Sequence, residues 1–272
     1  MQQNFTTPQT PQSQVSVAYS SAQTAGNANI VAVGWNDTNA SIVSLGDSAG
    51  NAYQTAIPTF RGNGLSQAIC YATNISAGTN TVTVTFNQPA AFVDLRVTEY
   101  SGMGPGSVFE GGTSGTGIGT TADSGPLTVG TINDLVFGAG MTADTFTGAG
   151  GGFTLRVITS PDSDIVEDQI AAATGSYSAT ASLNSTTAWL MQLGAFKAAP
   201  PASPLMRVFL TATNTMVVTW PSSSTYFTLQ QNSDLTTTGW MKVTNFVGTA
   251  GDEYQVILSP ASSGQFYRLK YP

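Results

Sequence analysis

Short segments rich in β-branched and aromatic residues recur along almost the whole chain, and no stretch shows the period of a long amphipathic helix. In TVTVTF, residues 81–86, three apolar residues alternate with threonines, which predicts a strand with one buried face and one hydroxyl face. Gly, Asn, Asp or Pro bounds most of these segments, as is typical of turns between strands. The sequence therefore predicts an all-β protein of antiparallel sheets.

The predicted strands form two groups separated by a proline-rich segment. KAAPPASP, residues 197–204, has three prolines in eight residues and is expected to be a stiff, extended linker. The many short strands before it favour a large, jelly-roll-like β-sandwich over residues 14–196. Six strand-like segments after it favour a small Ig-like or fibronectin-III-like sandwich over residues 205–272. Its core is expected to contain Trp220, Trp240 and Phe266.

The first residues, 1–13, differ from the rest in composition. They are mostly Gln, Thr and Pro with a single aromatic, Phe5, so little apolar area offsets the entropy of ordering them. Pro8 and Pro11 lack the N–H that a central strand donates. We expect a flexible tether, or alternatively a strand in which Phe5 adds to the sheet edge of a neighbouring copy.

Low charge excludes several kinds of partner. Charged residues make up 8% of the chain, against ~25% in an average soluble domain, while 39 Thr and 27 Ser supply neutral polarity. The formal net charge is −7, and the eight Lys and Arg residues are not clustered in the sequence. Binding to nucleic acid or to an anionic membrane is therefore not expected. No apolar run reaches the ~20 residues that span a bilayer.

The chain contains no histidine and one cysteine, Cys70. The absence of histidine excludes Ser-His-Asp and Cys-His nucleophile activation and H-E-x-x-H zinc hydrolysis. A single cysteine excludes an intrachain disulfide, and SQAICYATN favours a buried thiol at Cys70 that packs as a small apolar group. The opening MQQNFTTPQTPQSQ shows no basic or apolar signal region and is expected to be the start of a mature secreted chain with an added Met.

Two stretches resemble known extracellular modules. TMVVTWPSSSTYFTLQQNSDLTTTGWMKV, closing with FYRLK, resembles a short β module at the C-termini of secreted, multidomain proteins of environmental bacteria. VAVGWNDTNASIVSLGDSAGNAY and DLRVTEYSG are similar to uncharacterised extracellular domains of jelly-roll or concanavalin-like type. The resemblance implies an exported, modular protein at or outside the cell surface. It brings no known catalytic residue.

The stretch SPDSDIVEDQ, residues 160–169, holds four acids in a chain poor in charge. Pro161 is expected at the second position of a turn, and a strand starting near Asp164 would place Asp164, Val166 and Asp168 on one face. Glu167 would lie on the other face, so the four acids cannot converge on one ion. Asp162 and Asp164, with turn carbonyls, remain candidates for a weak calcium site, and the alternatives are a solvated turn or a capped short helix.

Other candidate residues lie in and beside a glycine-rich stretch. Residues 101–125 are expected to form a long surface loop, in which Met103, Phe109 and Glu110 are candidate ligand-binding residues. No helix pattern follows, so a phosphate-binding loop is not expected. In VDLRVTEY, Asp94 and Arg96 alternate with apolar residues and are expected to form a surface ion pair. Asp47 and Asn51 of SLGDSAGNAY are expected to fix a turn.

These observations leave three functions open. The first is a non-catalytic extracellular module that binds carbohydrate or a cell-surface polymer. The second is a self-assembling adhesin, matrix or fibre subunit, since few charges protect its sheet edges from pairing. The third is a glycoside hydrolase that uses carboxylates alone, with Asp94, Glu99 and Glu110 as candidate acids. No cofactor other than calcium is expected. The sequence does not choose among ligands, or between monomer and filament.

Overall fold

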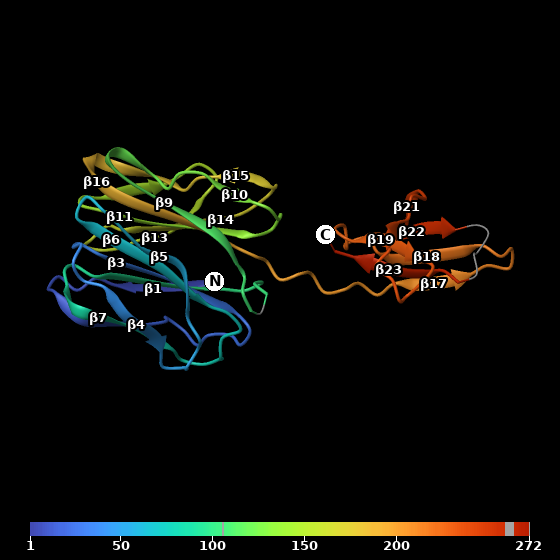
Figure 1. The fold of residues 1–272 in the computed structure, drawn as a ribbon, viewed down its shortest axis with the longest axis horizontal. Coiled ribbons are helices and arrows are strands. Elements are labelled where there is room, and N and C mark those ends of the chain that lie inside the picture. Colours follow the sequence, from blue (N-terminus) through green and yellow to red (C-terminus); the bar gives the residue numbers. More distant parts are fainter. Residues whose placement is uncertain (105, 259–263, 272) are drawn as a thin grey trace. The chain divides into compact units, whose positions relative to one another are not determined.

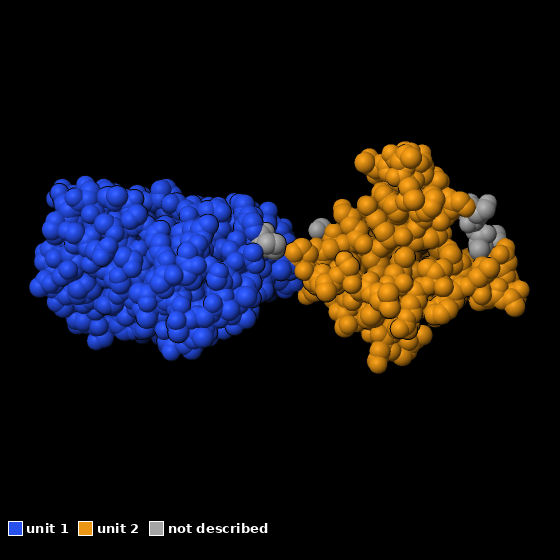
Figure 2. Space-filling model, turned by 90° about the horizontal axis from the view of Figure 1, so that it is seen from below, with its two compact units in different colours: residues 1–199 blue, residues 200–272 orange. Residues whose placement is uncertain are grey.

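A computed structural model describes residues 1–104, 106–258 and 264–271. The protein is all-β, with antiparallel sheets and no helix within those ranges. The chain forms two compact units, unit 1 (Met1–Ala199) and unit 2 (Pro200–Pro272), which are coloured separately in Figure 2. The described residues contain no helix long and apolar enough to cross a membrane.

Unit 1 contains two large sheets that repeat one topology. The first has the order β1-β8-β3-β6-β5. The second has the order β9-β16-β11-β14-β13, with β12 added along the first part of β16. Each strand of the second sheet therefore follows its counterpart in the first by eight positions. The bounds are β1 Gln2–Thr6, β3 Ala28–Trp35, β5 Gln54–Gly62, β6 Leu65–Ala72, β8 Asp94–Tyr100, β9 Phe109–Asp123, β11 Leu135–Thr142, β12 Phe146–Ala149, β13 Thr154–Ile158, β14 Ile165–Ile170 and β16 Thr180–Phe196.

A smaller sheet packs against each large one. The sheet β2-β7-β4 packs on the first, and the short pair β10-β15 packs beside β9 and β16 of the second, so that the two small sheets lie on opposite sides of unit 1 (Figure 1). Their bounds are β2 Gln12–Ala18, β4 Ile42–Asp47, β7 Thr81–Ala90, β10 Leu127–Val129 and β15 Gly175–Tyr177. Strand β7 contains the TVTVTF segment. Its Val82, Val84 and Phe86 are buried while its threonines are only partly covered, as the alternation predicts.

Three apolar layers separate these four sheets. Trp35 and Phe86 pack edge to face in the layer between the outer sheet β2-β7-β4 and the first large sheet. Ile30, Tyr71 and Phe137 belong to the middle layer, where the two large sheets face each other. A third layer, which includes Phe146, lies between the second large sheet and its outer strands. The central strands of the two large sheets, β3, β6, β8 and β11, are therefore covered on both faces.

Residues 1–13 are not the flexible segment that the sequence predicts, because their first part is a strand. Residues 2–6 form β1, which pairs antiparallel with β8, and Phe5 lies opposite Arg96. Because β1 buries little apolar area, side-chain hydrogen bonds help to hold it in place. The Asn4 side-chain amide, for example, donates to the Ala18 carbonyl at 2.8 Å. Strand β1 is at the edge of its sheet, where prolines just beyond it are tolerated. The strand thus covers the edge of β8 within its own chain.

The start of the predicted linker also belongs to unit 1. The amides of Lys197 and Ala199 donate to the carbonyls of Val108 and Gly102 at 2.8 and 2.7 Å, respectively. Residues 197–199 are therefore attached to the segment between β8 and β9, and unit 2 begins at Pro200.

Unit 2 consists of a four-stranded sheet, β17-β18-β22-β21, and a three-stranded sheet, β20-β19-β23. The two enclose a core that contains Val218, Trp220, Leu229 and Val256. Of the three aromatics expected in this core, only Trp220 is buried, whereas Trp240 is half-buried and Phe266 is exposed. The bounds are β17 Arg207–Leu210, β18 Met216–Pro221, β19 Thr228–Asn232, β20 Met241–Lys242, β21 Val247–Ala250, β22 Glu253–Leu258 and β23 Phe266–Lys270.

We expect a fragment of residues 200–272 to fold alone, because it has its own two sheets and its own apolar core. Domains of about 60 residues are marginal but stable enough to fold. The measurement is an amide correlation spectrum of the isolated fragment. Dispersed resonances that match those of unit 2 in the whole protein are expected, and collapsed resonances would contradict the prediction.

Candidate functional site

The glycine-rich stretch does not form the predicted ligand-binding loop. Residues 109–123 are strand β9, paired along β16, and Pro105 lies outside the described residues. Met103 is buried and Phe109 packs against Tyr71 and Phe196 in the middle apolar layer. Glu110 lies 3.5 Å from Lys197. The two apolar candidates are thus used in packing within unit 1.

The glycines of β9 are required by close packing rather than by loop flexibility. A Cβ at Gly117 would come within 2.6 Å of the Trp189 ring, and one at Gly112 within 2.7 Å of Ile57. Both distances are shorter than real Cβ contacts. Glycine therefore lets β9 lie flat against bulky side chains while its backbone pairs with β16.

Of the acids of SPDSDIVEDQ, Glu167 and Asp168 lie on opposite faces of β14, as the alternation predicts. Val166 belongs to the middle apolar layer, and Asp168 on the same face accepts hydrogen bonds from Tyr100 at 2.5 Å and from Arg156 at 2.7 Å. Glu167 faces the other way and accepts a bond from the Gly150 amide at 2.9 Å. Asp168 thereby links two strands of one sheet to the sheet that faces it.

The two calcium candidates have different environments. Asp164 is buried, and its Oδ1 accepts the Thr142 amide at 2.9 Å. Asp162 is half-buried, and its Oδ1 accepts the Gln9 amide at 2.6 Å. Among the described residues, no group of three or more His, Cys, Asp or Glu side chains has an arrangement that could hold a metal ion. Calcium binding at Asp162 and Asp164 gains no support from this geometry.

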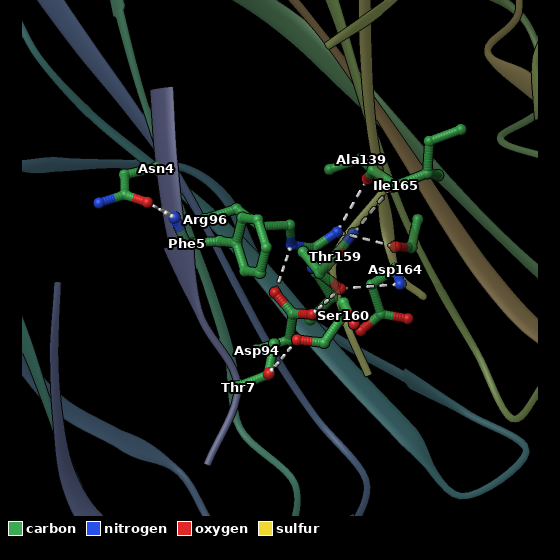
Figure 3. Close-up of polar contacts among 12 residues, drawn as sticks. Asn4, Phe5, Thr7, Asp94, Arg96, Ala139, Thr159, Ser160, Asp164 and Ile165 are labelled. Carbon is green, nitrogen blue, oxygen red and sulfur yellow. Dashed lines mark hydrogen bonds and ion pairs between the residues drawn. The ribbon is translucent and has the colours of Figure 1, made fainter. Parts of the chain in front are cut away.

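Asp94 and Arg96 form an ion pair, but inside the protein rather than on its surface. The Arg96 Nε lies 3.1 Å from Asp94 Oδ1, and both side chains are fully buried (Figure 3). Thr159 donates its hydroxyl to Asp94 Oδ2 and accepts the Asp164 amide at 3.0 Å. Phe5 of β1 lies beside Arg96 on the edge of this cluster. The sequence alone predicts a surface pair, because the residues of the facing sheet that cover it are distant in the sequence.

The guanidinium of Arg96 crosses from one large sheet to the other. Its Nη1 donates to the carbonyls of Gly140 and Ile165, both at 2.8 Å. Its Nη2 donates to Gln67 Oε1 at 2.7 Å, and Gln67 in turn bonds Gln192 at 3.2 Å. These contacts join β8 and β6 to β11, β14 and β16. Arg96 therefore stabilises the packing of the two large sheets against each other.

Burial controls the protonation of the acids in this region. Burial raises the pKa of Asp164 well above its ordinary range, and the neighbouring Asp94 charge adds to the effect. Burial also raises the pKa of Asp94, although Arg96 opposes the shift. Burial raises the pKa of Glu167 to about 7 and, together with Glu110, that of Asp134 to about 6. Burial thus raises the pKa of each of these four acids above its ordinary value, because the apolar interior disfavours the charged form.

A cleft beside strand β4 is the best candidate for a ligand site in unit 1. One pocket, of about 340 Å³, lies between β4 and the irregular edge strand β5, whose pairing with β6 shifts register twice. A second, of about 500 Å³, lies on the outer face of the β2-β7-β4 sheet. The two pockets adjoin, since Ser44 and Leu45 line both. The first also contains Tyr53, Gln54, Thr55, Pro58 and Thr59, and the second Gln14, Asp47, Ser48, Thr81, Thr83 and Thr85.

The lining of this cleft offers hydrogen bonds rather than covalent chemistry. Cys70 lines the inner pocket, where burial raises the pKa of its thiol and keeps it in the unreactive form. Asp47 is already used: Asn51, Tyr53 and Asn80 all donate to its Oδ2 at 2.7–3.0 Å, in the predicted turn. Although burial opposes it, hydrogen bonds from Asn80 and Asn51 lower the pKa of Asp47. The other polar side chains of the lining are neutral and carry hydroxyl or amide groups.

Sequence reasoning found only part of this cleft. The alternation in TVTVTF predicts the outward threonines of β7, but nothing in the sequence marks the irregularity of β5 that opens the inner pocket. No protein family, no curated protein and no solved structure was found to match this chain.

We expect Arg96→Met to lower the free energy of unfolding by about 3–5 kcal/mol, because it leaves Asp94 buried without a counter-charge. Asp94→Asn combined with Arg96→Met is expected to recover part of that loss. Lys197→Met, which removes a largely exposed pair with Glu110, serves as control and is expected to cost less than about 1 kcal/mol. Denaturant unfolding of unit 1 measures all three, and equal effects for Arg96→Met and Lys197→Met would contradict the role of Arg96.

We also expect unit 1 to become less stable as pH rises from about 5 to about 8. Glu167 has a pKa of about 7 in the folded protein, so it binds a proton more tightly there than in the unfolded chain. Proton binding by Glu167 therefore stabilises the folded protein at low pH, and this stabilisation is lost as pH rises through about 7. Asp134 acts in the same direction near pH 6. Glu167→Gln is expected to flatten the pH dependence of the melting temperature, whereas Asp123→Asn, at an exposed site, is expected to preserve it. A pH dependence that survives Glu167→Gln unchanged would rule out this source.

Proposed function

We propose that the protein is a non-catalytic, exported binding protein that holds a carbohydrate chain in the cleft beside β4. The observation that supports this most is the pair of adjoining pockets that share Ser44 and Leu45. Their volumes, about 340 and 500 Å³, lie in the range of small-ligand sites. Because the cleft is open and continues over the edge of β4, it suits a section of a longer chain better than an enclosed small molecule.

The chemistry of the lining also favours a sugar. Hydroxyls of Ser44, Thr59 and Thr83 and the amide of Gln54 donate and accept hydrogen bonds without carrying charge. Such groups match the neutral hydroxyls of a polysaccharide. Tyr53 and Pro58 add apolar surface against which a sugar ring can pack.

The same lining does not favour hydrolysis. A glycosidase of the usual kind needs two carboxyl groups on either side of the scissile bond. Asp47 is the one acid among the described residues of the cleft, and three side chains already donate to it. Asp94 is buried between the large sheets, and Glu99 accepts bonds from Thr24 and Asn27 elsewhere in unit 1.

Export and the finer architecture belong to the same proposal. The sheet layers of unit 1 are compatible with jelly-roll-like sandwiches, and the seven described strands of unit 2 fit the strand number of a small Ig-like domain. Low charge and abundant Ser and Thr are consistent with an extracellular setting. Self-assembly through the first strand is less favoured, because β1 already pairs with β8 of its own chain.

The test is a substitution that fills the cleft without touching the core. Ser44 is exposed and lines both pockets, so Ser44→Arg is expected to weaken binding to the cognate neutral polysaccharide at least tenfold, or about 1.4 kcal/mol. Ser182→Arg, at an exposed strand serine outside the cleft, is the matched control and is expected to bind as the unsubstituted protein does. Retention on columns of immobilised neutral glycans gives the readout.

Two results would reject the proposal. One is equal retention of the Ser44→Arg and Ser182→Arg variants on every polysaccharide that the protein binds. The other is release of reducing ends from a bound glycan, since that would show turnover.

A further inference from the structure

Unit 2 presents a second kind of surface, on the outer face of its β20-β19-β23 sheet. The strand register places Lys242, Gln230 and Arg268 in one row across the three strands. Leu229 and Val243 point into the core, so this row must point outward. Lys270 lies in the next row, opposite Thr228, and is exposed. Three of the eight Lys and Arg residues of the chain therefore share one sheet face of unit 2.

These cations are available to a ligand. Among the residues that the structure describes, the ion pair found in unit 2 is Arg207 with Glu253, which belongs to the other sheet. Asp234, in the turn after β19, directs its Oδ1 to the amide and hydroxyl of Thr236. Lys242, Arg268 and Lys270 have no acidic partner within the described ranges. The positive charge of this face is uncompensated locally.

One of the cations is held in a fixed orientation. The Arg268 guanidinium lies 4.2 Å from the centroid of the Trp240 ring, and its Nε donates to Gln230 Oε1 at 3.0 Å. Its two terminal nitrogens make no hydrogen bond within the described residues. A guanidinium held in this way binds a carboxylate through two parallel hydrogen bonds with little loss of side-chain entropy.

Aromatic surface lies beside the charges. Trp240 is half-buried under Arg268, and Phe266 is exposed on the same face of β23, two residues before Arg268. An apolar ring next to cations and an amide presents complementary groups to an acidic sugar: the ring packs on the sugar face, and the cations bind its carboxylate.

We propose that the outer face of the β20-β19-β23 sheet binds an anionic polysaccharide of the polyuronate class. This site is separate from the cleft of unit 1 and goes beyond the neutral carbohydrate proposed there. The carboxylates of successive sugar residues pair with Arg268, Lys270 and Lys242, and a sugar ring packs on the exposed Phe266.

A second copy of the protein fits this face less well. Of the acids in unit 1, a large share are buried and present no charge at the surface: Asp94, Glu99, Asp134, Asp164, Glu167 and Asp168. The remaining acids are spread over loops and strand ends rather than gathered on one complementary surface. A flexible polymer with a regular spacing of carboxylates therefore complements the cationic face better than unit 1 does.

The experiment uses the whole protein and two charge-matched double variants. Arg268→Gln with Lys270→Gln removes one Arg and one Lys from the proposed face. Arg207→Gln with Lys197→Gln removes the same residue types at exposed sites elsewhere. Affinity for polygalacturonate is measured by gel electrophoresis through the immobilised polymer, with dextran as the neutral comparison. Phosphatidylglycerol vesicles and a single-stranded oligonucleotide test the other anionic partners.

We expect the first double variant to lose at least tenfold in affinity for polygalacturonate and the second less than about threefold. Raising NaCl from about 0.05 M to about 0.5 M should weaken binding of the unsubstituted protein, because it shortens the screening length. Ser44→Arg should leave polygalacturonate binding unchanged, which separates this site from the cleft. Unchanged melting of both double variants would show that the substitutions leave the fold intact.

Equal losses in the two double variants would overturn the proposal, since net charge alone would then explain the binding. So would tighter binding to vesicles or to the oligonucleotide than to polygalacturonate, with that binding lost in the first double variant. An unsubstituted protein that does not bind polygalacturonate at low salt would reject it directly.

Discussion

The central strands of the two large sheets of unit 1 are buried on both faces, and the rest of the unit depends on this. Every residue of β3, β6, β8 and β11 is buried. Backbone polar groups in such a position are satisfied by ladder hydrogen bonds, but side-chain polar groups must find partners in the interior. Arg96 does so by bonding carbonyls of the facing sheet, and Asp168 does so through Tyr100 and Arg156. The polar contacts between the sheets fix how the two halves of unit 1 are aligned.

This double burial explains which sequence-based expectations succeed. In β7 one face is open, so apolar and hydroxyl residues alternate and the strand is predicted correctly with its faces. In β8 both faces are covered, and the polar residues of VDLRVTEY, read as a solvated face, lie inside instead. A buried Asp–Arg pair has the same local sequence as an exposed one. Only the facing sheet, contributed by residues about 40 to 100 positions away, decides between them.

The same reasoning applies to the binding surfaces. The threonines that line the second pocket of the cleft can be predicted from their alternation in β7. The first pocket depends on two register shifts in β5, and no residue pattern predicts those shifts. Glycines at positions 112 and 117 suggest a loop, yet they are needed because Ile57 and Trp189 occupy the space of their side chains. In unit 2 the alternation of Phe266, Arg268 and Lys270 with Tyr267 and Leu269 is readable in the sequence. The strand register that places Lys242 in the same row as Arg268 cannot be predicted from the sequence.

The repeated strand order of unit 1 has a consequence for where its folding boundary lies. Each repeat, a large sheet with its outer strands, has the strand number of an independent sandwich, but one face of its large sheet is completed only by the other repeat. A chain ending after β8 would expose Ile30, Ile69 and Tyr71 to water along a whole sheet. We therefore expect the smallest stable piece of unit 1 to be the pair of repeats, although the repeated strand order suggests a division between them.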